Sequence, residues 1–214
     1  MRLRAVLFDV GETLLDETTL WQGWADWLGI PRFTFVALFG ASIERGEDRL
    51  RVFEMLRPGF DLEAERQRRI ESADRYGIAP TDLYPDAAPC LQALKDEGYV
   101  VGIAGNSTAL VEQAVAGMGL SVDVVTSSES LGVEKPSRDF FTRMAELAGV
   151  GPTEAAYVGD RLDNDVLPAR EAGMVGVFIR RGPWGYLHAL RPEAEMADLR
   201  IDSLDELPAA LRSL

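Results

Sequence analysis

The sequence predicts an α/β protein: a doubly wound parallel sheet with a small all-helical domain inserted near its start. Beyond residue 85, short apolar runs typical of buried strands alternate with helical patterns, as in parallel sheets whose strands are joined by helices. Residues 15–85 contain several helical patterns and no convincing strand. We therefore expect a core formed by residues 1–14 and 86–214 and a helical domain formed by residues 15–85, which a chain of 214 residues can accommodate.

The expected strands of the core are short and rich in valine, isoleucine and alanine, as strands buried on both faces are. They cover residues 5–8, 99–104, 122–126, 155–159 and 175–180, with a short strand near Ile201. The expected helices cover residues 86–97, with Asp86 as the cap, 108–118, 137–148 and 163–172, followed by a final helix capped by Ser203.

The inserted segment carries amphipathic helix patterns. Trp21 and Trp24 lie at helical spacing, which favours packing between helices over a ligand-binding role. Asp61 is expected to cap a charged helix that runs to Tyr76 and stops at Gly77. Because the segment follows the first strand, near the carboxyl ends of the sheet, it is well placed to act as a lid.

A polar residue with possible chemical function follows each of four apolar runs. Asp9 follows the first run, Asn106 the second, Lys135 lies beyond the third, and Asp160 follows the fourth, with Asp165 close behind. All strand carboxyl ends of an open parallel sheet face one crevice, so these groups can converge. Carboxylates, a lysine and an amide in one crevice describe a site for a divalent cation and a phosphate.

Each of these residue types has a plausible chemical role there. An aspartate such as Asp9 can attack phosphorus and form an aspartyl phosphate, and the hard oxygens of Asp160 and Asp165 suit Mg²⁺. Lys135 can hold phosphate as a point charge, and the turn at Gly105–Ser107 can donate hydrogen bonds to phosphate oxygens. Each signature alone also fits a turn, a helix cap or a surface lysine; their shared order and position favour a site.

The chain resembles the haloacid dehalogenase-like (HAD) hydrolase superfamily over essentially its whole length. The motifs that carry the resemblance are Phe8-Asp-Val-Gly-Glu-Thr-Leu14, Ile103-Ala-Gly-Asn106, Gly132-Val-Glu-Lys135-Pro136 and Val158-Gly-Asp160-Arg-Leu-Asp-Asn-Asp165. The helical insert looks like the small cap of the subgroup in which the cap follows the first strand. Most members of this superfamily are phosphatases, some are dehalogenases and a few are mutases.

The resemblance implies a Rossmann-like core and a Mg²⁺-dependent phosphatase of a small phosphorylated metabolite. Asp9 would be the nucleophile and a metal ligand, together with the carbonyl of Gly11. Asp160 would bind the metal directly, and Asp165 would bind it through water or orient Lys135. Lys135 would steady both the phosphate and the nucleophile, and the phosphate would also meet the turn formed by Gly105, Asn106 and Ser107.

Two departures from the family pattern concern the reaction itself. The usual second aspartate, the general acid and base, is replaced by Gly11, and the usual hydroxyl residue before Asn106 is replaced by Gly105. A positioned acid–base group contributes about 10²–10⁴-fold, so we expect a phosphohydrolase that is slow or depends on its leaving group. Glu12 is expected to be an exposed glutamate rather than a substitute acid, whereas Ser107 as a surrogate phosphate donor stays open.

Two alternative functions remain open at this point. One is a descendant without catalysis that binds a phosphorylated ligand or a partner protein; the other, less favoured, is a 2-haloacid dehalogenase, which needs no metal. The net charge of −13 argues against nucleic acid and anionic membranes as partners. The single cysteine, Cys90, is expected to be buried, His188 is expected at the surface, and the cytoplasm is the expected location. The sequence does not indicate an oligomeric state.

Overall fold

The computed structural model describes residues 3–72 and 77–214. The chain falls into two compact units: Met1–Asp16 with Ala79–Leu214, and Glu17–Ile78. Each unit is described by itself below. The expected end of a helix at Tyr76 lies outside the described residues. Within the described ranges, no helix combines the length and apolar composition that a membrane crossing requires.

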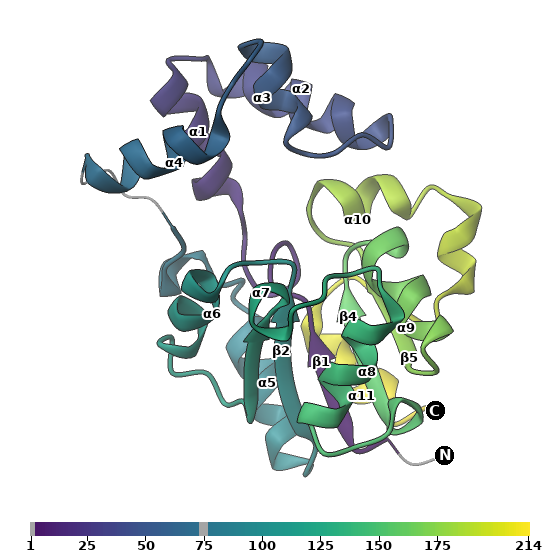
Figure 1. Cartoon of the computed structure of the whole chain (residues 1–214). Helices are drawn as coiled ribbons and strands as arrows, with labels where there is room; N and C mark the ends of the chain where they lie inside the picture. Colours follow the sequence, from purple (N-terminus) through teal and green to yellow (C-terminus); the bar gives the residue numbers. More distant parts are fainter. Residues whose placement is uncertain (1–2, 73–76) are drawn as a thin grey trace. The chain divides into compact units, whose positions relative to one another are not determined.

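The first unit is built on one six-stranded sheet in the order β3-β2-β1-β4-β5-β6, in which every neighbouring pair is parallel (Figure 1). The strands are β1 (Ala5–Phe8), β2 (Val100–Gly105), β3 (Val124–Ser127), β4 (Ala155–Gly159), β5 (Val175–Ile179) and β6 (Leu199–Ile201). The helical insert follows β1, so the predicted fold class is confirmed.

Helices cover both faces of this sheet (Figure 1). They are α5 (Ala87–Asp96), α6 (Ala109–Ala116), α7 (Ser128–Leu131), α8 (Arg138–Leu147), α9 (Leu167–Glu171), α10 (Gly182–His188) and α11 (Leu207–Leu211). Short helical turns lie at Pro80–Asp82, Pro152–Glu154, Leu162–Val166, Pro192–Met196 and Leu204–Glu206.

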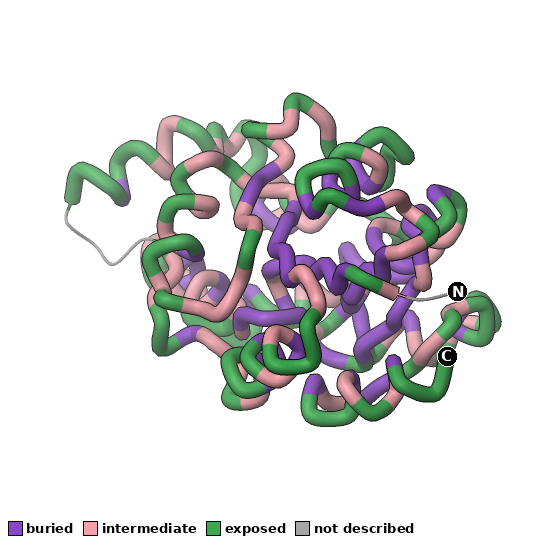
Figure 2. The backbone as a smooth tube through the Cα atoms, turned by 90° about the horizontal axis from the view of Figure 1, so that it is seen from below, coloured by how far each residue is buried: buried purple, intermediate pink, exposed green. Residues whose placement is uncertain are grey.

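The centre of the sheet is fully buried, as Figure 2 shows along the tube. Strand β1 lies between β2 and β4, with Ala5 opposite both Val100 and Ala155. Packing of α8 on this centre is close: a Cβ on Gly102 would lie 2.6 Å from the Met144 side chain. This register brings the carboxyl ends of three adjacent strands together, and that is what positions the candidate site.

The second unit consists of α1 (Thr18–Leu28), α2 (Arg32–Glu44), α3 (Arg51–Leu56) and α4 (Leu62–Glu71). Its interior is aromatic: the Trp21 and Phe39 rings lie 4.4 Å apart, and Trp24 meets Phe53 edge-on at 5.0 Å. Both tryptophans are buried in this packing, as predicted. The Asp61 side chain accepts a hydrogen bond from the Ala64 N–H and caps α4, also as predicted.

Here the structure corrects two local predictions, for Asp86 and His188, and adds one helix. Asp86 does not cap α5, because its carboxylate binds Arg181, Ser203 and the Leu204 N–H instead. Helix α10 was not predicted; it forms in a Gly/Pro-rich stretch, where Pro183 suits a first helical turn. This helix carries His188, which is buried rather than at the surface. Cys90 is buried, as expected.

Candidate active site

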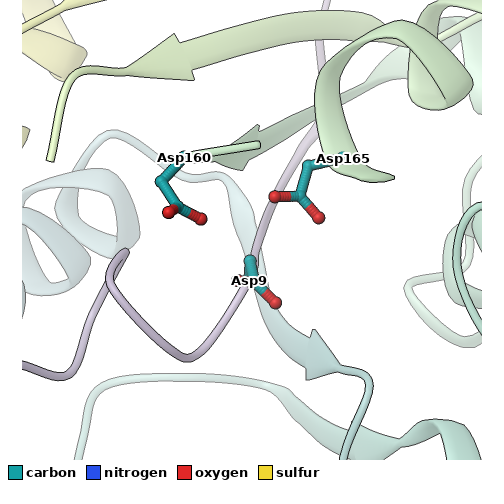
Figure 3. Close-up of side chains that lie close together, drawn as sticks. All are labelled: Asp9, Asp160 and Asp165. Carbon is teal, nitrogen blue, oxygen red and sulfur yellow. The ribbon is translucent and has the colours of Figure 1, made fainter. Parts of the chain in front are cut away.

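Three aspartates converge beyond the ends of β1 and β4. Asp9 directly follows β1, and its N–H donates to the Val158 carbonyl at 2.9 Å, which fixes it beside the neighbouring strand. Asp160 directly follows β4, and Asp165 lies in the turn behind it. One oxygen from each of the three carboxylates lies within 4.8 Å of the others (Figure 3).

Asp165 reaches this cluster because the chain makes room for it. Its segment forms a single π-helical turn, in which the Arg161 carbonyl accepts from both the Asp165 and Val166 N–H groups. A Cβ on Gly159 would lie 2.5 Å from the Asp165 carboxylate, so only glycine fits at the end of β4. The Arg161 N–H then donates to Asp165 Oδ2 at 3.1 Å and fixes the carboxylate.

Lys135 bridges two of the three carboxylates. Its Nζ donates to Asp9 Oδ1 at 2.5 Å and to Asp165 Oδ1 at 2.6 Å, and its side chain is 1% exposed. Burial disfavours the charged lysine, but the Asp165 and Asp9 carboxylates outweigh this effect and raise the pKa of Lys135 well above its usual value. The ammonium group therefore stays charged.

The three carboxylates together carry more negative charge than one lysine offsets. Burial, followed by the nearby charges of Asp165 and Asp9, raises the pKa of Asp160 well above its usual value. Burial also raises the pKa of Asp165 to about 6, although Lys135 opposes this shift. Among the described residues, Asp160 Oδ2 is buried without a hydrogen-bond partner. A buried carboxylate oxygen in that state suits a divalent cation, and hard oxygen donors are the ligands that Mg²⁺ prefers.

The turn after β2 lies against the same cluster. A Cβ on Gly105 would lie 3.0 Å from Asp9 Oδ1, so the backbone passes close to the nucleophile candidate. The Asn106 side chain binds the backbone of Lys135 at both ends of its amide. The Ser107 N–H donates to Ser128 Oγ at 3.2 Å. The structure thus brings Gly105 to Asp9 and Asn106 to Lys135, while the Ser107 backbone is tied to the segment after β3.

The turn after Asp9 contains a feature that the sequence interpretation missed. Glu12 is buried rather than exposed and has a φ of 54°, which is uncommon for a residue other than glycine. The Tyr84 hydroxyl donates to Glu12 Oε2 at 2.7 Å, and a Cβ on Gly182 would lie 2.5 Å from that oxygen. The negative charge of Glu12 also helps to raise the pKa of Asp160, so Glu12 belongs to the electrostatic environment of the cluster.

Arg181 lies just after β5 and stabilises the turn that follows Asp9. Its guanidinium lies 4.0 Å from the centre of the Tyr84 ring, donates to the Thr13 carbonyl at 2.9 Å and pairs with Asp86. No short motif could have revealed these contacts, because the residues that each hydrogen bond joins are 72 to 168 positions apart in the sequence. Gly11, which precedes Glu12 in the sequence, forms an isolated β-bridge with Leu15.

His188 contacts the loop that carries the acidic residues. Its Nδ1 accepts a hydrogen bond from the buried Leu162 N–H at 3.0 Å, which requires the neutral ring. Burial lowers the pKa of His188 to about 4, although Asp163 opposes this shift. His188 therefore supports the loop between Asp160 and Asp165 as a neutral acceptor.

Comparisons with known proteins identify the family. A family model described as haloacid dehalogenase-like hydrolase matches residues 3–173. A glyceraldehyde 3-phosphate phosphatase of Methanopyrus kandleri is 38% identical over 99% of this chain and 98% of its own. A plasmid phosphoglycolate phosphatase of Cupriavidus necator is 30% identical over 97% and 92%, respectively. The crystal structure of a HAD phosphatase from Thermococcus onnurineus superimposes with a TM-score of 0.62 at 28% identity, covering 98% of each chain.

The chain belongs to the haloacid dehalogenase-like hydrolase family. The family resemblance and the fold class predicted from the sequence are therefore both confirmed.

Proposed function

We propose that the protein is a Mg²⁺-dependent phosphatase of a small phosphorylated metabolite that works through an aspartyl phosphate on Asp9. The observation that carries this proposal is the buried Lys135 bridge between Asp9 and Asp165, beside the unpartnered oxygen of Asp160. The full-length relatives named above support the substrate class, since both are named as phosphatases of small phosphorylated metabolites. The unit Glu17–Ile78 is proposed as the cap domain of this enzyme.

The residues of the cluster fit a bound Mg²⁺. Asp9, Asp160 and the Gly11 carbonyl would hold the ion, and Asp165 would bind it through water or orient Lys135. When bound, the ion neutralises charge and withdraws electrons from the phosphoryl group. Asp9 then attacks phosphorus: a bond forms between its carboxylate oxygen and phosphorus while the bond to the leaving oxygen breaks. Lys135 orients the Asp9 carboxylate and stabilises negative charge on the phosphoryl oxygens.

The proton transfers are the unusual part of this mechanism. An alkoxide leaving group needs a proton, and the water that later hydrolyses the aspartyl phosphate must lose one. Gly11 has no side chain to serve either step. Turnover is therefore expected to favour acyl, aryl or anhydride phosphates, whose leaving oxygens need no proton. Glu12, buried and held by Tyr84, is the nearest candidate in sequence for a substitute acid and base.

Two other functions make different predictions. A binding protein without catalysis is favoured by the missing side chains at Gly11 and Gly105, but it has no need for an intact Asp9–Lys135–Asp165 bridge. A 2-haloacid dehalogenase would also use an aspartate nucleophile, yet it would act without metal, whereas the clustered carboxylates suit a cation.

A phosphate-release screen across a metabolite panel, with and without Mg²⁺, separates these functions. We expect release that requires Mg²⁺ and vanishes in Asp9→Asn. Absence of release from every phosphate ester, acyl phosphate and anhydride, with phosphorylated ligands still bound, would support the binding protein. Halide release that is independent of metal would support the dehalogenase.

A further inference from the structure

We propose that Asn106 is a positioning residue for Lys135: its amide fixes the lysine backbone and thereby holds the ammonium group between Asp9 and Asp165. This assigns Asn106 to the lysine rather than to the phosphate. The consequence for catalysis rests on the proposed phosphatase function, whereas the positioning itself rests on geometry alone.

The contact between the two residues is reciprocal. Asn106 Nδ2 donates to the Lys135 carbonyl at 2.8 Å, and the Lys135 N–H donates to Asn106 Oδ1 at 2.8 Å. A carboxamide offers a donor and an acceptor side by side, so it can satisfy both backbone groups of one residue in the way a neighbouring strand would. An aspartate could serve only the N–H, and a serine or alanine cannot match both.

The position of this contact allows it to determine where the Lys135 side chain lies. It joins the turn after β2 to the segment before α8, across 29 residues of sequence. Proline follows at position 136, so the next residue has no backbone N–H with which to anchor the segment. Both Nζ contacts, at 2.5 and 2.6 Å, are short charge-assisted bonds, and the backbone at position 135 sets where the buried side chain that makes them begins.

The backbone of the turn after Asn106 is hydrogen-bonded as well. Gly105 has no side chain, and the Ser107 backbone N–H and C=O both engage Ser128 Oγ. The amide of Asn106 is engaged with Lys135. We therefore assign the Asn106 amide to placing Lys135, and the Ser107 hydroxyl stays open as the phosphate donor of the turn.

The sequence offers a direct test of the positioning, because Lys95 and Lys135 are its only lysines. The Lys95 side chain is 30% exposed and that of Lys135 is 1% exposed. Amine-reactive labelling of the full-length protein without metal, read by peptide mass spectrometry, therefore compares Lys135 with an internal reference. We expect Asn106→Ala to raise the labelling rate of Lys135 relative to Lys95 about tenfold or more.

Ser128→Ala is the matched control, since it loosens the same turn without touching Lys135. Lys135 should remain as slowly labelled in this variant as in the wild type. If Asn106→Ala does not unfold cooperatively, Asn106→Asp replaces it, because it keeps the acceptor for the Lys135 N–H but sets a charged carboxylate oxygen against the Lys135 carbonyl in place of the donor. Lys135 in this variant should then be labelled faster than Lys135 in the wild type. Equal protection of Lys135 in the wild type and in the folded Asn106 variant would overturn the proposal.

A double-mutant cycle tests the consequence for the site. The binding of inorganic phosphate in the presence of Mg²⁺ is measured by calorimetry for the wild type, Asn106→Ala, Lys135→Met and the double variant. With Lys135 present, Asn106→Ala should weaken phosphate binding by about tenfold. In the Lys135→Met background, the same change should weaken phosphate binding by less than about twofold. An equal loss in both backgrounds would mean that Asn106 meets the phosphate itself and would overturn the proposal. A protein that releases phosphate from no phosphate ester, acyl phosphate or anhydride would refute the proposed function and leave the labelling result intact.

Discussion

Replacing Lys135 by methionine tests how strongly one buried cation holds the acidic cluster together. The side chains of Lys135 and Asp165 are 1% and 0% exposed, and the lysine makes the two short contacts with Asp9 and Asp165. Removing one partner of a buried ion pair leaves an uncompensated charge, which costs about 3–5 kcal/mol. We therefore expect Lys135→Met to lower the free energy of unfolding by about this amount at pH 7.5 in the presence of a chelator.

Lys95→Met is the matched control for this measurement. Lys95 contacts Asp123 at 2.6 and 2.7 Å, distances like those of Lys135, but the two side chains are 30% and 37% exposed. Exposed pairs of this kind contribute about 0–1 kcal/mol, so the burial of Lys135 and its bridge between two carboxylates should separate the two variants. Urea unfolding followed by circular dichroism measures both.

Two additions to the experiment identify the cause of the loss. Asp165→Asn in the Lys135→Met background removes one buried charge and should recover part of the stability. Mg²⁺ should also recover part, up to about 2.7 kcal/mol at a concentration one hundred times the dissociation constant. Equal stability of Lys135→Met and Lys95→Met, or no recovery by either addition, would refute the reasoning.

Three further outcomes are expected. The pKa of His188 is about 4 in the folded protein against about 6.5 when unfolded, so the folded state loses stability as pH falls from 6.5 towards 4. His188→Gln, which does not titrate there, should show about 2 kcal/mol less loss between pH 7 and 4.5 in urea titrations; parallel pH profiles would contradict this role. Gly159→Ala should displace the Asp165 carboxylate and weaken Mg²⁺ binding measured by calorimetry by at least about tenfold, since its Cβ has no room; unchanged affinity would show that the loop relaxes. Gly11→Asp should raise kcat for alkyl phosphates more than for aryl phosphates, by about 10-fold or more, and an equal change for both classes would count against a missing acid–base group.

Much of the core could be predicted from the sequence because its signals are local. Strands buried on both faces need continuous apolar runs, and the runs before Asp9 and Asp160 end where the structure ends β1 and β4. Parallel strands place their carboxyl ends together, so the meeting of Asp9, Lys135 and Asp165 followed from the order of the motifs. The aromatic interior of the helical unit followed equally from helical spacing.

The features that were missed depend on partners distant in the sequence. Glu12 is buried because Tyr84 binds it and Gly182 leaves room for it, and none of these facts is visible in a short motif. Asp86 has the sequence position of a cap, but Arg181 engages its carboxylate instead. His188 follows a stretch rich in glycine and proline and was expected at the surface, but it is buried against the Leu162 N–H. Each error arose where a long-range contact prevailed over a local preference.

The nature of the covalent intermediate tests the central claim most directly. An acid-quenched single turnover with an acyl or aryl phosphate and Mg²⁺, analysed by peptide mass spectrometry, should find one phosphoryl group on Asp9. That adduct should be absent without Mg²⁺. Phosphate release at the normal rate with no phosphoryl group on Asp9, or release that persists in Asp9→Asn, would contradict the account.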